Sequence, residues 1–362
     1  MPEQFQTHKQ DFSKTQIVEY SANETLQSGE VRASVKHYSF TANNITYAVV
    51  GERIRYWEFF PAVESNNAEW GVIPVWGFAE VVESKCDDIP VGERLFGYFP
   101  PANELVIKPV HVSQLSFIDG AEHRSTLPPG YNVYRRVGNE PGYSRDFDEE
   151  RMLLYPLYVT AFCIHDMLQD NNWFDAEQVV VISASSKTSI GTGYAIAEDD
   201  TAPTLIGLTS ARNRQFVESI SVYDQVMDYD QIETIDATKA TVIVDMSANG
   251  EVIGRLHKHL GDNMKFCSNV GITHWDDVNM GPDFIAERSQ QFFAPGHIQK
   301  RMKDWGGAKF DQLSTEFIMR TAAKSREWLS IHHVSGLAGL ADVYPKVLNG
   351  EAPPKEGIIV SM

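Results

Sequence analysis

The feature that most constrains the fold is a stretch of alternating strand and helix patterns between Tyr155 and Gly271. Four apolar runs are separated by segments with helical spacing, and these runs are EQVVVISAS, APTLIGLTS, ATVIVDMSAN and MKFCSNVG. Strands that are apolar along their whole length are typical of parallel sheets, which helices cover on both faces. The alternation therefore predicts an α/β fold with a doubly wound parallel sheet and right-handed crossovers.

A different pattern occupies residues 30–109, where short β-type segments are broken by turns: VRASVKHYSF, IPVWGFAEVVES and ELVIKP. Gly92 and Gly97 predict a tight hairpin or barrel corner. The pattern indicates an antiparallel, β-rich domain. Because 362 residues exceed one ordinary core, we expect two domains. The β-rich domain takes residues 1–154 and about 330–362, and the parallel-sheet domain takes 155–329.

Three remaining segments are less regular. Residues 119–151 show no period and are interpreted as a long surface excursion. The stretch FDQLSTEFIMRTAAKSREWLSIHHV predicts one long helix, and the final IIVSM predicts a strand at an edge of either sheet.

Charge and cysteine content exclude several classes of protein. The net charge is −18, from 31 basic and 49 acidic residues, which disfavours nucleic acid and anionic membranes as partners. Cys86, Cys163 and Cys267 have no CxxC or His-paired spacing, so neither a disulfide scaffold nor a sequence-local zinc site is expected. No apolar run has the length of a membrane span, and we expect a cytoplasmic protein.

The order of these segments, from Glu30 to Met362, resembles the medium-chain dehydrogenase/reductase superfamily in its zinc-independent, quinone-oxidoreductase-like branch. EVRASVKHYSFTANNITYAVVG resembles the first hairpin of the catalytic domain, and LYVTAFCIHDML resembles the helix that precedes the nucleotide-binding domain. The SASSKTSIG loop and the FFAP segment resemble those of an uncharacterised family within the superfamily. The resemblance implies a Rossmann nucleotide-binding domain, a β-rich GroES-like catalytic domain, and an active site in the cleft between them.

The zinc ligands of the superfamily are missing here. Where zinc-dependent members have a Cys and a Gly-His-Glu, this chain reads YSFTANN and VWGFAE. Three cysteines also cannot supply a four-cysteine structural site. We therefore expect no bound metal.

The first βα turn of the predicted parallel sheet is rich in serine where the superfamily has glycines. Glycines let the backbone approach a pyrophosphate at a helix N-terminus. Here hydroxyls and one ammonium group are the candidate cofactor ligands: Ser183, Ser185, Ser186, Lys187 and Thr188. The alternative is that the serines only cap a helix. Lys187 opposes the helix dipole, so it either contacts phosphate or acts as an acid/base group.

The end of the second parallel strand indicates which cofactor is used. Ser210, Arg212 and Arg214 follow this strand without any Asp or Glu, which favours NADP over NAD because hydroxyl and guanidinium groups bind a 2′-phosphate. The alternative is that both arginines are simply solvated. The resemblance adds further candidate cofactor contacts: Thr160, Tyr229, Ser247, Asn269 and Gly271.

Tyr47 is the first candidate for chemistry, because a neutral phenol can donate a hydrogen bond to a developing enolate. Asn43, Asn44, Tyr158 and Lys187 are further candidates. A packed strand tyrosine is an equally good interpretation of Tyr47. Four histidines lack any nucleophile or metal spacing and are interpreted as structural: His37, His165, His274 and His297.

These features favour an NADP-dependent oxidoreductase that reduces an activated alkene, quinone or carbonyl. The alternatives are a C–C bond-cleaving lyase of retro-aldol type, or a catalytically silent binding protein on the same scaffold. Aromatic residues near the presumed cleft favour an apolar or aromatic small-molecule substrate: Trp57, Phe59, Phe60, Trp76 and Phe78. The resemblance also implies a homodimer.

Overall fold

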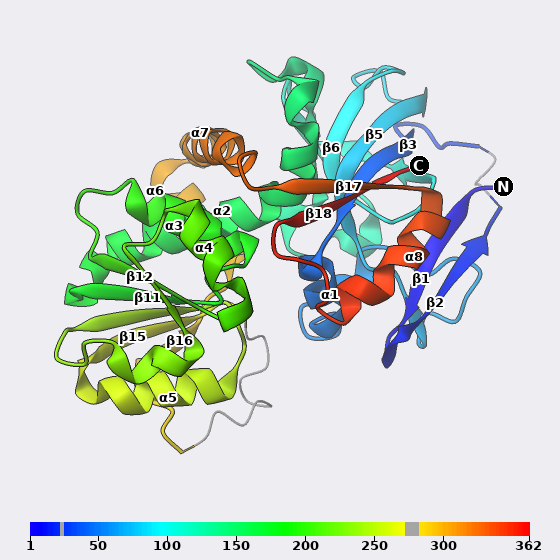
Figure 1. Ribbon diagram of the computed structural model, residues 1–362. Helices are drawn as coiled ribbons and strands as arrows, with labels where there is room; N and C mark the ends of the chain where they lie inside the picture. The colour runs from blue at the N-terminus through cyan, green and yellow to red at the C-terminus, as the bar shows by residue number, and fades with distance from the viewer. Residues whose placement is uncertain (22–24, 272–281) are drawn as a thin grey trace. The chain divides into compact units, whose positions relative to one another are not determined.

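The computed structural model describes residues 1–21, 25–271 and 282–362 (Figure 1). These residues form two compact units. We call Met1–Leu153 with Leu329–Met362 the mixed-sheet unit, and Leu154–Trp328 the parallel-sheet unit. That the chain folds as two separate domains, divided after residue 154 and near 330, stays a prediction.

The parallel-sheet unit is built on six strands that all run in one direction. Their order is β13-β12-β11-β14-β15-β16, which is the 3-2-1-4-5-6 order of a Rossmann sheet. The doubly wound parallel sheet predicted from the sequence is confirmed. The strands are β11 (Gln178–Ile182), β12 (Thr204–Thr209), β13 (Gln225–Asp228), β14 (Thr241–Asp245), β15 (Met264–Asn269) and β16 (Ser289–Gln291).

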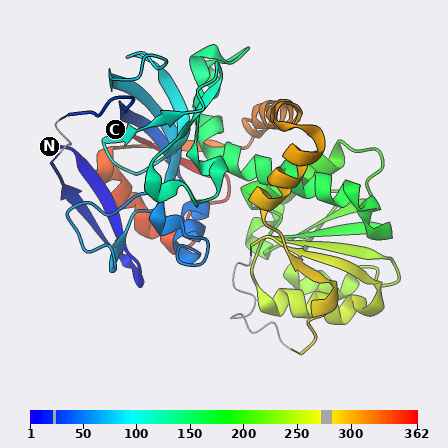
Figure 2. The ribbon, with the colours of Figure 1, turned by 180° about the vertical axis from the view of Figure 1, so that it is seen from behind.

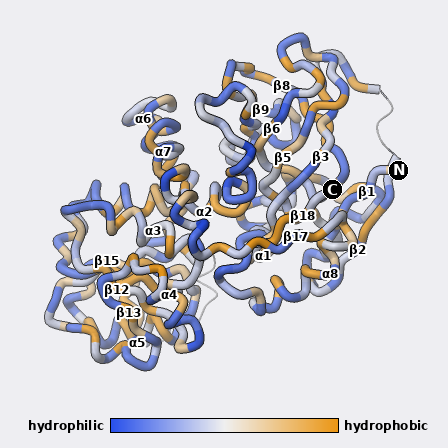
Figure 3. Tube along the Cα trace, turned by 45° about the horizontal axis from the view of Figure 1, so that its top comes forward, coloured by the Kyte–Doolittle hydropathy of each residue, from blue (hydrophilic) through white to orange (hydrophobic). Residues whose placement is uncertain are grey.

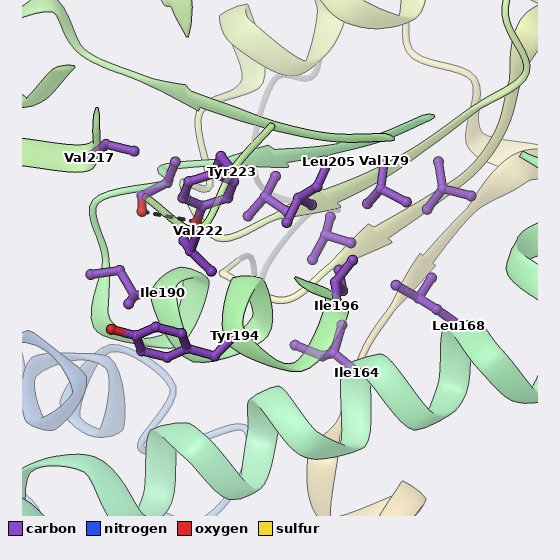
Figure 4. Close-up of a cluster of buried hydrophobic side chains, with 14 of the residues drawn as sticks. Ile164, Leu168, Val179, Ile190, Tyr194, Ile196, Leu205, Val217, Val222 and Tyr223 are labelled. Carbon is purple, nitrogen blue, oxygen red and sulfur yellow. Dashed lines mark hydrogen bonds between the residues drawn. The ribbon is translucent and has the colours of Figure 1, made fainter. Parts of the chain in front are cut away.

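Both faces of this sheet are buried, because alternate side chains of each strand point to opposite faces. In β11, Val179 and Val181 join a cluster with α2, α3 and α4, in which Figure 4 labels Val179. Val180 and Ile182 join a cluster with α5. Figure 2 shows the ribbon of this sheet with helices on both faces. The strands are accordingly coloured mainly as hydrophobic in Figure 3. The helices are α2 (Asp148–Asp170), α3 (Lys187–Ala197), α4 (Arg214–Ile220), α5 (Gly250–Leu260), α6 (Ala294–Trp305) and α7 (Gly307–Ser325).

The mixed-sheet unit contains a nine-stranded sheet and a three-stranded sheet. The first has the order β17-β18-β3-β5-β6-β10-β9-β8 with β7 beside β3, and the second has the order β2-β1-β4. The final strand therefore joins this unit, but the prediction that it lies at a sheet edge is wrong, because β18 pairs with β17 on one side and with β3 on the other. The strands are β1 (Glu3–His8), β2 (Asp11–Glu19), β3 (Val31–Phe40), β4 (Trp70–Gly71), β5 (Val75–Ser84), β6 (Arg94–Phe99), β7 (Glu104–Ile107), β8 (Pro109–Val110), β9 (Ser116–Asp119), β10 (Val133–Arg136), β17 (Ser330–Ser335) and β18 (Glu356–Ser361), and the helices are α1 (Ala42–Val49) and α8 (Gly336–Leu348).

The two glycines expected at a β corner have separate roles. Gly92 takes a φ of +87° in the loop between β5 and β6, a conformation that favours glycine. Gly97 lies under the ring of Tyr134, where a Cβ would come within 2.6 Å of the ring. Strands β5 and β6 form an antiparallel pair, but residues 85–93 connect them, so the predicted tight turn is wrong, and Gly97 lies inside β6 and serves packing.

The interpretation of residues 119–151 as a surface excursion is wrong. Strand β10 lies inside the segment and pairs with both β6 and β9. Arg124 and Tyr134 are fully buried, and Arg124 forms a buried ion pair with Asp119. The segment has no sequence period because its order comes from these non-local contacts.

One further prediction needs correction, and one segment has a structure that the sequence analysis did not predict. The long helix predicted through residue 334 ends at Ser325, because Ser330–Ser335 forms β17 and pairs in parallel with β18. The polar start of the chain forms β1 and β2, with the Gln6 amide buried and donating to the Val63 carbonyl at 2.8 Å. Tertiary pairing overrides local pattern in both places.

None of the helices in the described ranges has the length and apolar character that crossing a bilayer requires.

Candidate functional site

The serine-rich turn lies at the carboxyl end of β11 and leads into α3. Ser186 caps the helix, since its hydroxyl accepts the Ser189 N–H at 3.2 Å, and Lys187 is the first helical residue. Ser183 has a φ of +62°, a left-handed conformation that costs a residue with a Cβ roughly 1–2 kcal/mol. The turn therefore contains, at Ser183, a backbone conformation that a glycine would adopt without strain.

The turn is tied to the end of the neighbouring strand. The Asn213 side-chain amide donates to the Ser185 hydroxyl at 3.1 Å, joining the first βα turn to the residues that follow β12. Ser185 is buried, and its backbone N–H makes no hydrogen bond with any residue that the structure describes. An N–H donor without a partner is thus held at the start of α3.

The residues after β12 differ in how strongly they are engaged. Arg214 is committed to neighbours, with ion pairs to Glu218 at 2.9 Å and to Asp228 at 3.3 Å. Arg212 is exposed and forms no ion pair or side-chain hydrogen bond within the described ranges. Ser210 is half-buried at the start of the short 3-10 helix Ala211–Asn213. Of the two arginines, Arg212 is the one available to an anion.

In the turn after β14, the carboxylate of Asp245 accepts the hydrogen bonds of the turn's own donors. Asp245 is fully buried and accepts hydrogen bonds from the Ser247 N–H at 2.8 Å, the Ser247 hydroxyl at 2.6 Å and the Ala248 N–H at 3.3 Å. Burial raises the pKa of the Asp245 carboxyl above its usual value, against the lowering effect of these bonds. The donors of Ser247, a predicted cofactor contact, are therefore already engaged.

The end of β15 holds a second donor without a partner. Asn269 is fully buried, and its side-chain N–H₂ group has no hydrogen-bond partner among the described residues. Gly271 follows, where a Cβ would lie 2.6 Å from the Met246 backbone, so only glycine fits. Buried donors of this kind are rare and are commonly satisfied by water or a ligand.

Tyr229 is the first residue of the 3-10 helix Tyr229–Thr234, directly after β13. It is half-buried, and burial, followed by the nearby charge of Asp245, raises the pKa of its phenol. The carboxyl ends of β11, β12, β13, β14 and β15 thus carry the predicted cofactor residues along one edge of the parallel sheet.

Tyr158 and Thr160 lie on α2, and both hydroxyls are engaged. Tyr158 is fully buried, its hydroxyl is 2.6 Å from the Ser325 hydroxyl, and its ring fills the space beside Gly191. The Thr160 hydroxyl donates to the Pro156 carbonyl at 2.8 Å. The packing of Tyr158 points to positioning α3 rather than to chemistry, and its catalytic role stays a prediction.

The expected catalytic-domain hairpin is wrong at the candidate catalytic residues Asn43, Asn44 and Tyr47, because Ala42–Val49 forms the helix α1. Asn44 is buried and serves the backbone: its side chain accepts the Thr41 N–H at 2.8 Å and donates to the Pro74 carbonyl at 2.9 Å. Asn43 is half-buried and also hydrogen bonds to Tyr47. Asn44 is therefore a capping residue, and its catalytic role stays a prediction without support from these contacts.

Tyr47 belongs to a buried group of aromatic rings. Its oxygen accepts the Trp76 indole N–H at 3.1 Å, and burial raises the pKa of its phenol, so the hydroxyl stays protonated at neutral pH. The ring centroids of Tyr47 and Tyr56 are 4.7 Å apart, and the Tyr56 hydroxyl is 2.7 Å from that of Tyr131. The Tyr98 hydroxyl is buried with no partner in the described ranges.

We call these residues the tyrosine cluster: Tyr47, Tyr56, Tyr98, Tyr131, Trp76 and Phe59. Of its tyrosines, the sequence singled out Tyr47 alone. Tyr131 comes from the segment interpreted as a surface excursion, and Tyr56 follows α1. Among the other predicted cleft residues, Phe60 contacts Tyr98, Phe78 packs on Phe96, and Trp57 contacts Phe12.

Three of the four histidines singled out in the sequence each pair with one neighbouring side chain. His37 hydrogen bonds to Ser361 at 3.1 Å, His165 to Asp199 at 2.9 Å, and His297 to Asp166 at 2.5 Å. His274 lies outside the described residues. Among those described, no three His, Cys, Asp or Glu residues lie together as metal ligands, and the absence of zinc stays a prediction.

Comparison with solved structures places this architecture in a known class. CurA from Vibrio vulnificus has a TM-score of 0.63 at 14% identity, with 100% of this chain and 99% of that chain covered. Its complex with NADPH also has a TM-score of 0.63, at 13% identity over 96% of this chain and 94% of that chain. A putative NADPH:quinone reductase from Bacillus thuringiensis has a TM-score of 0.60 at 12% identity, with 100% and 99% covered. The chain has the fold of medium-chain dehydrogenase/reductase enzymes, a Rossmann unit with a GroES-like unit.

The family model described as "Protein of unknown function (DUF2855)" matches residues 38–353. The chain belongs to this family. A search of curated proteins finds no match.

Proposed function

We propose that this protein is a zinc-independent, NADP-dependent oxidoreductase of the quinone-oxidoreductase-like branch, which reduces an activated alkene, quinone or carbonyl. One observation carries the proposal. Along the carboxyl edge of a sheet with Rossmann order, the Ser185 N–H and the Asn269 amide are buried donors without partners in the described ranges. Ligands of open α/β sheets bind outside this edge.

The residues fit an NADP molecule in chemical type. The serine-rich turn and the start of α3 supply N–H and hydroxyl donors for a pyrophosphate, with Lys187 as the local positive charge. Ser210 and Arg212 suit a 2′-phosphate, and no acid in the stretch 209–214 competes for the ribose. The bound cofactor would supply hydride. Asn269 and Gly271 are proposed beside the nicotinamide, and Tyr229 near the adenosine.

Not every predicted contact is equally suited to the cofactor. Arg214 is held by two carboxylates and the Ser247 donors by Asp245, so we propose that these two residues shape the site instead of binding NADP. Ser183, Ser186, Thr188 and Thr160 stay proposed contacts.

Tyr47 is the proposed proton donor of the mixed-sheet unit. Because the Trp76 N–H occupies one lone pair of the phenolic oxygen, the O–H hydrogen stays available to an acceptor. Burial keeps the phenol neutral. The surrounding tyrosine cluster favours an apolar or aromatic substrate, which its rings can contact without losing hydrogen bonds to water.

We also propose a homodimer that forms through β16. This strand is the last of the parallel sheet, and within the described residues it pairs on one side only, with β15. An open edge of this kind can pair with a second copy. A monomeric mass in light scattering at micromolar concentration would contradict the proposal.

Calorimetric titration of the purified chain with NADPH and NADH tests the proposed function before any substrate is known. NADPH is expected to bind with a micromolar Kd and more tightly than NADH. No binding of NADPH at millimolar concentration would overturn the reductase and leave the lyase or the silent binding protein.

A further inference from the structure

Tyr223 lies behind the serine-rich turn, 39 residues later in the chain, and touches it through its hydroxyl. The phenolic oxygen is 3.1 Å from the Ala184 carbonyl and 3.1 Å from the Ser189 carbonyl. Its one hydrogen is therefore shared between the turn and the first turn of α3. The residue is buried within the core of the parallel-sheet unit. Figure 4 labels Tyr223 among the buried side chains of this core.

The structure makes room for this ring with one glycine. A Cβ on Gly207 of β12 would lie 2.7 Å from the ring, too close for a real contact, whereas a Cβ on Gly193 of α3 would lie 3.5 Å from it, an ordinary packing distance. A side chain at Gly207 would displace the tyrosine. The ring therefore occupies a fitted position between β12 and α3, and its hydroxyl is directed to the turn.

The contact fixes the orientation of one peptide group. In a trans peptide the C=O and the following N–H point in opposite directions. Holding the Ala184 carbonyl toward Tyr223 thus turns the Ser185 N–H away from the tyrosine, and this is the N–H without a partner in the described ranges. Ser183 holds its left-handed conformation one residue earlier, where a glycine would adopt it without strain.

We propose that Tyr223 is a positioning residue for the pyrophosphate of the nucleotide. It does not touch the ligand but orients the Ser185 N–H from behind, and so replaces the backbone freedom that glycines give to such turns. This inference rests on the proposed function.

The test compares two ligands on two variants. Tyr223→Phe removes only the hydroxyl and is expected to weaken NADPH binding roughly three- to tenfold. Adenosine 2′-phosphate, which has no pyrophosphate, is expected to bind the variant as it binds the parent. Tyr194→Phe is the matched control, because it removes another hydroxyl from the same core, one that accepts the Trp328 N–H at 3.0 Å. The control should leave both affinities unchanged.

The outcomes separate this inference from the proposed function. If the parent binds both ligands and Tyr223→Phe binds NADPH with the same Kd as the parent, the positioning role of Tyr223 is overturned but the proposed function is not. Equal weakening of both ligands also overturns it, because that result indicates general loosening of the core. If the parent binds neither ligand, the proposed function itself fails. Should Tyr223→Phe not fold, Gly207→Ala displaces the ring and is expected to give the same selective loss of NADPH.

Discussion

Two neighbouring turns of the parallel sheet each contain one left-handed residue, but they differ in whether an acidic side chain occupies the turn. The turns follow β11 and β14, which pair in parallel up to Ile182 and Asp245. Each contains a left-handed residue that is not glycine, Ser183 with a φ of +62° and Ala248 with a φ of +55°. In the second turn the Asp245 carboxylate accepts three donors, whereas the first contains hydroxyls and no acid.

The presence of an acid in one turn and its absence from the other explain why only one of the two turns suits an anion. A buried carboxylate uses the N–H donors of its turn and would repel a phosphate. In the first turn the Ala184 carbonyl is held from behind by Tyr223, and the Ser185 N–H has no partner among the described residues. Under the proposed function, we therefore expect the anionic part of the nucleotide at the turn after β11.

The largest expected effect is the loss of the acid that closes the second turn. Asp245→Ala leaves two N–H groups and a hydroxyl near a buried site without their acceptor, and should lower the free energy of unfolding by about 3 kcal/mol. Urea denaturation measures this change. Asp236→Ala is the matched control, since Asp236 accepts the N–H and hydroxyl of Thr238 in the same local pattern but is exposed. The control should lose much less stability than Asp245→Ala, because an exposed site leaves its donors open to water, and equal losses would contradict the comparison.

The pH dependence of the same residue has a defined sign. Burial raises the pKa of Asp245 in the folded chain above the ordinary aspartate pKa of 3.8. Between these two pKa values Asp245 holds a proton in the folded state that it has released in the unfolded state. Its contribution to stability therefore falls as the pH rises from about 3.8 through the folded pKa, and is constant above it. Asp245→Asn, which cannot ionise, should remove this component from the pH profile of unfolding.

The next effect concerns the open guanidinium after β12. Arg212→Ala should weaken NADPH binding roughly ten- to a hundredfold by removing a charge-assisted hydrogen bond, and should leave NADH unchanged. Calorimetry on both nucleotides measures the preference, and Ser210→Ala should reduce it further. Arg255→Ala is the control, an arginine on α5 that pairs with Glu233. Equal affinity of the parent for the two nucleotides would show that this strand end does not bind the 2′-phosphate.

The smallest effect is expected at the start of α3. Lys187→Ala should weaken NADPH binding roughly three- to tenfold by removing a charge near the pyrophosphate, with little change in thermal stability because a cation at a helix N-terminus opposes the dipole. If Lys187 instead forms a Schiff base, the variant should bind NADPH normally, and borohydride should trap a carbonyl compound on the parent alone. Normal NADPH binding by the variant, together with borohydride trapping on the parent, would favour the lyase.

The parallel-sheet unit was predictable because its strands and helices follow from the pattern of apolar residues within each short segment. Each of the four apolar runs became a strand, and the serine-rich turn, Ser210 and Asn269 fell at strand ends, since strand ends follow directly from strand limits. The contacts behind the turn were not predictable. Tyr223 and Ala184 are far apart in the chain, and no local pattern links a tyrosine to a carbonyl 39 residues earlier.

The mixed-sheet unit was harder to predict because its contacts are mostly non-local. Residues 42–49 looked like part of a hairpin and form α1, where Asn44 caps the helix through Thr41. Tyr131 joins the tyrosine cluster only because β10 pairs with β6 and β9. The sequence therefore predicted Tyr47 as a candidate but not the aromatic rings around it.

The position of β18 has a consequence for how the chain folds during synthesis. This strand lies between β17 and β3, so Phe40 pairs with Ile358 across more than 300 residues. The parallel-sheet unit is continuous in sequence and can close once Trp328 has left the ribosome, whereas the larger sheet must wait with β3 lacking one neighbour. During that interval one edge of β3 can pair with a wrong strand, and we expect the pairing of β18 with β3 to be a slow step of folding.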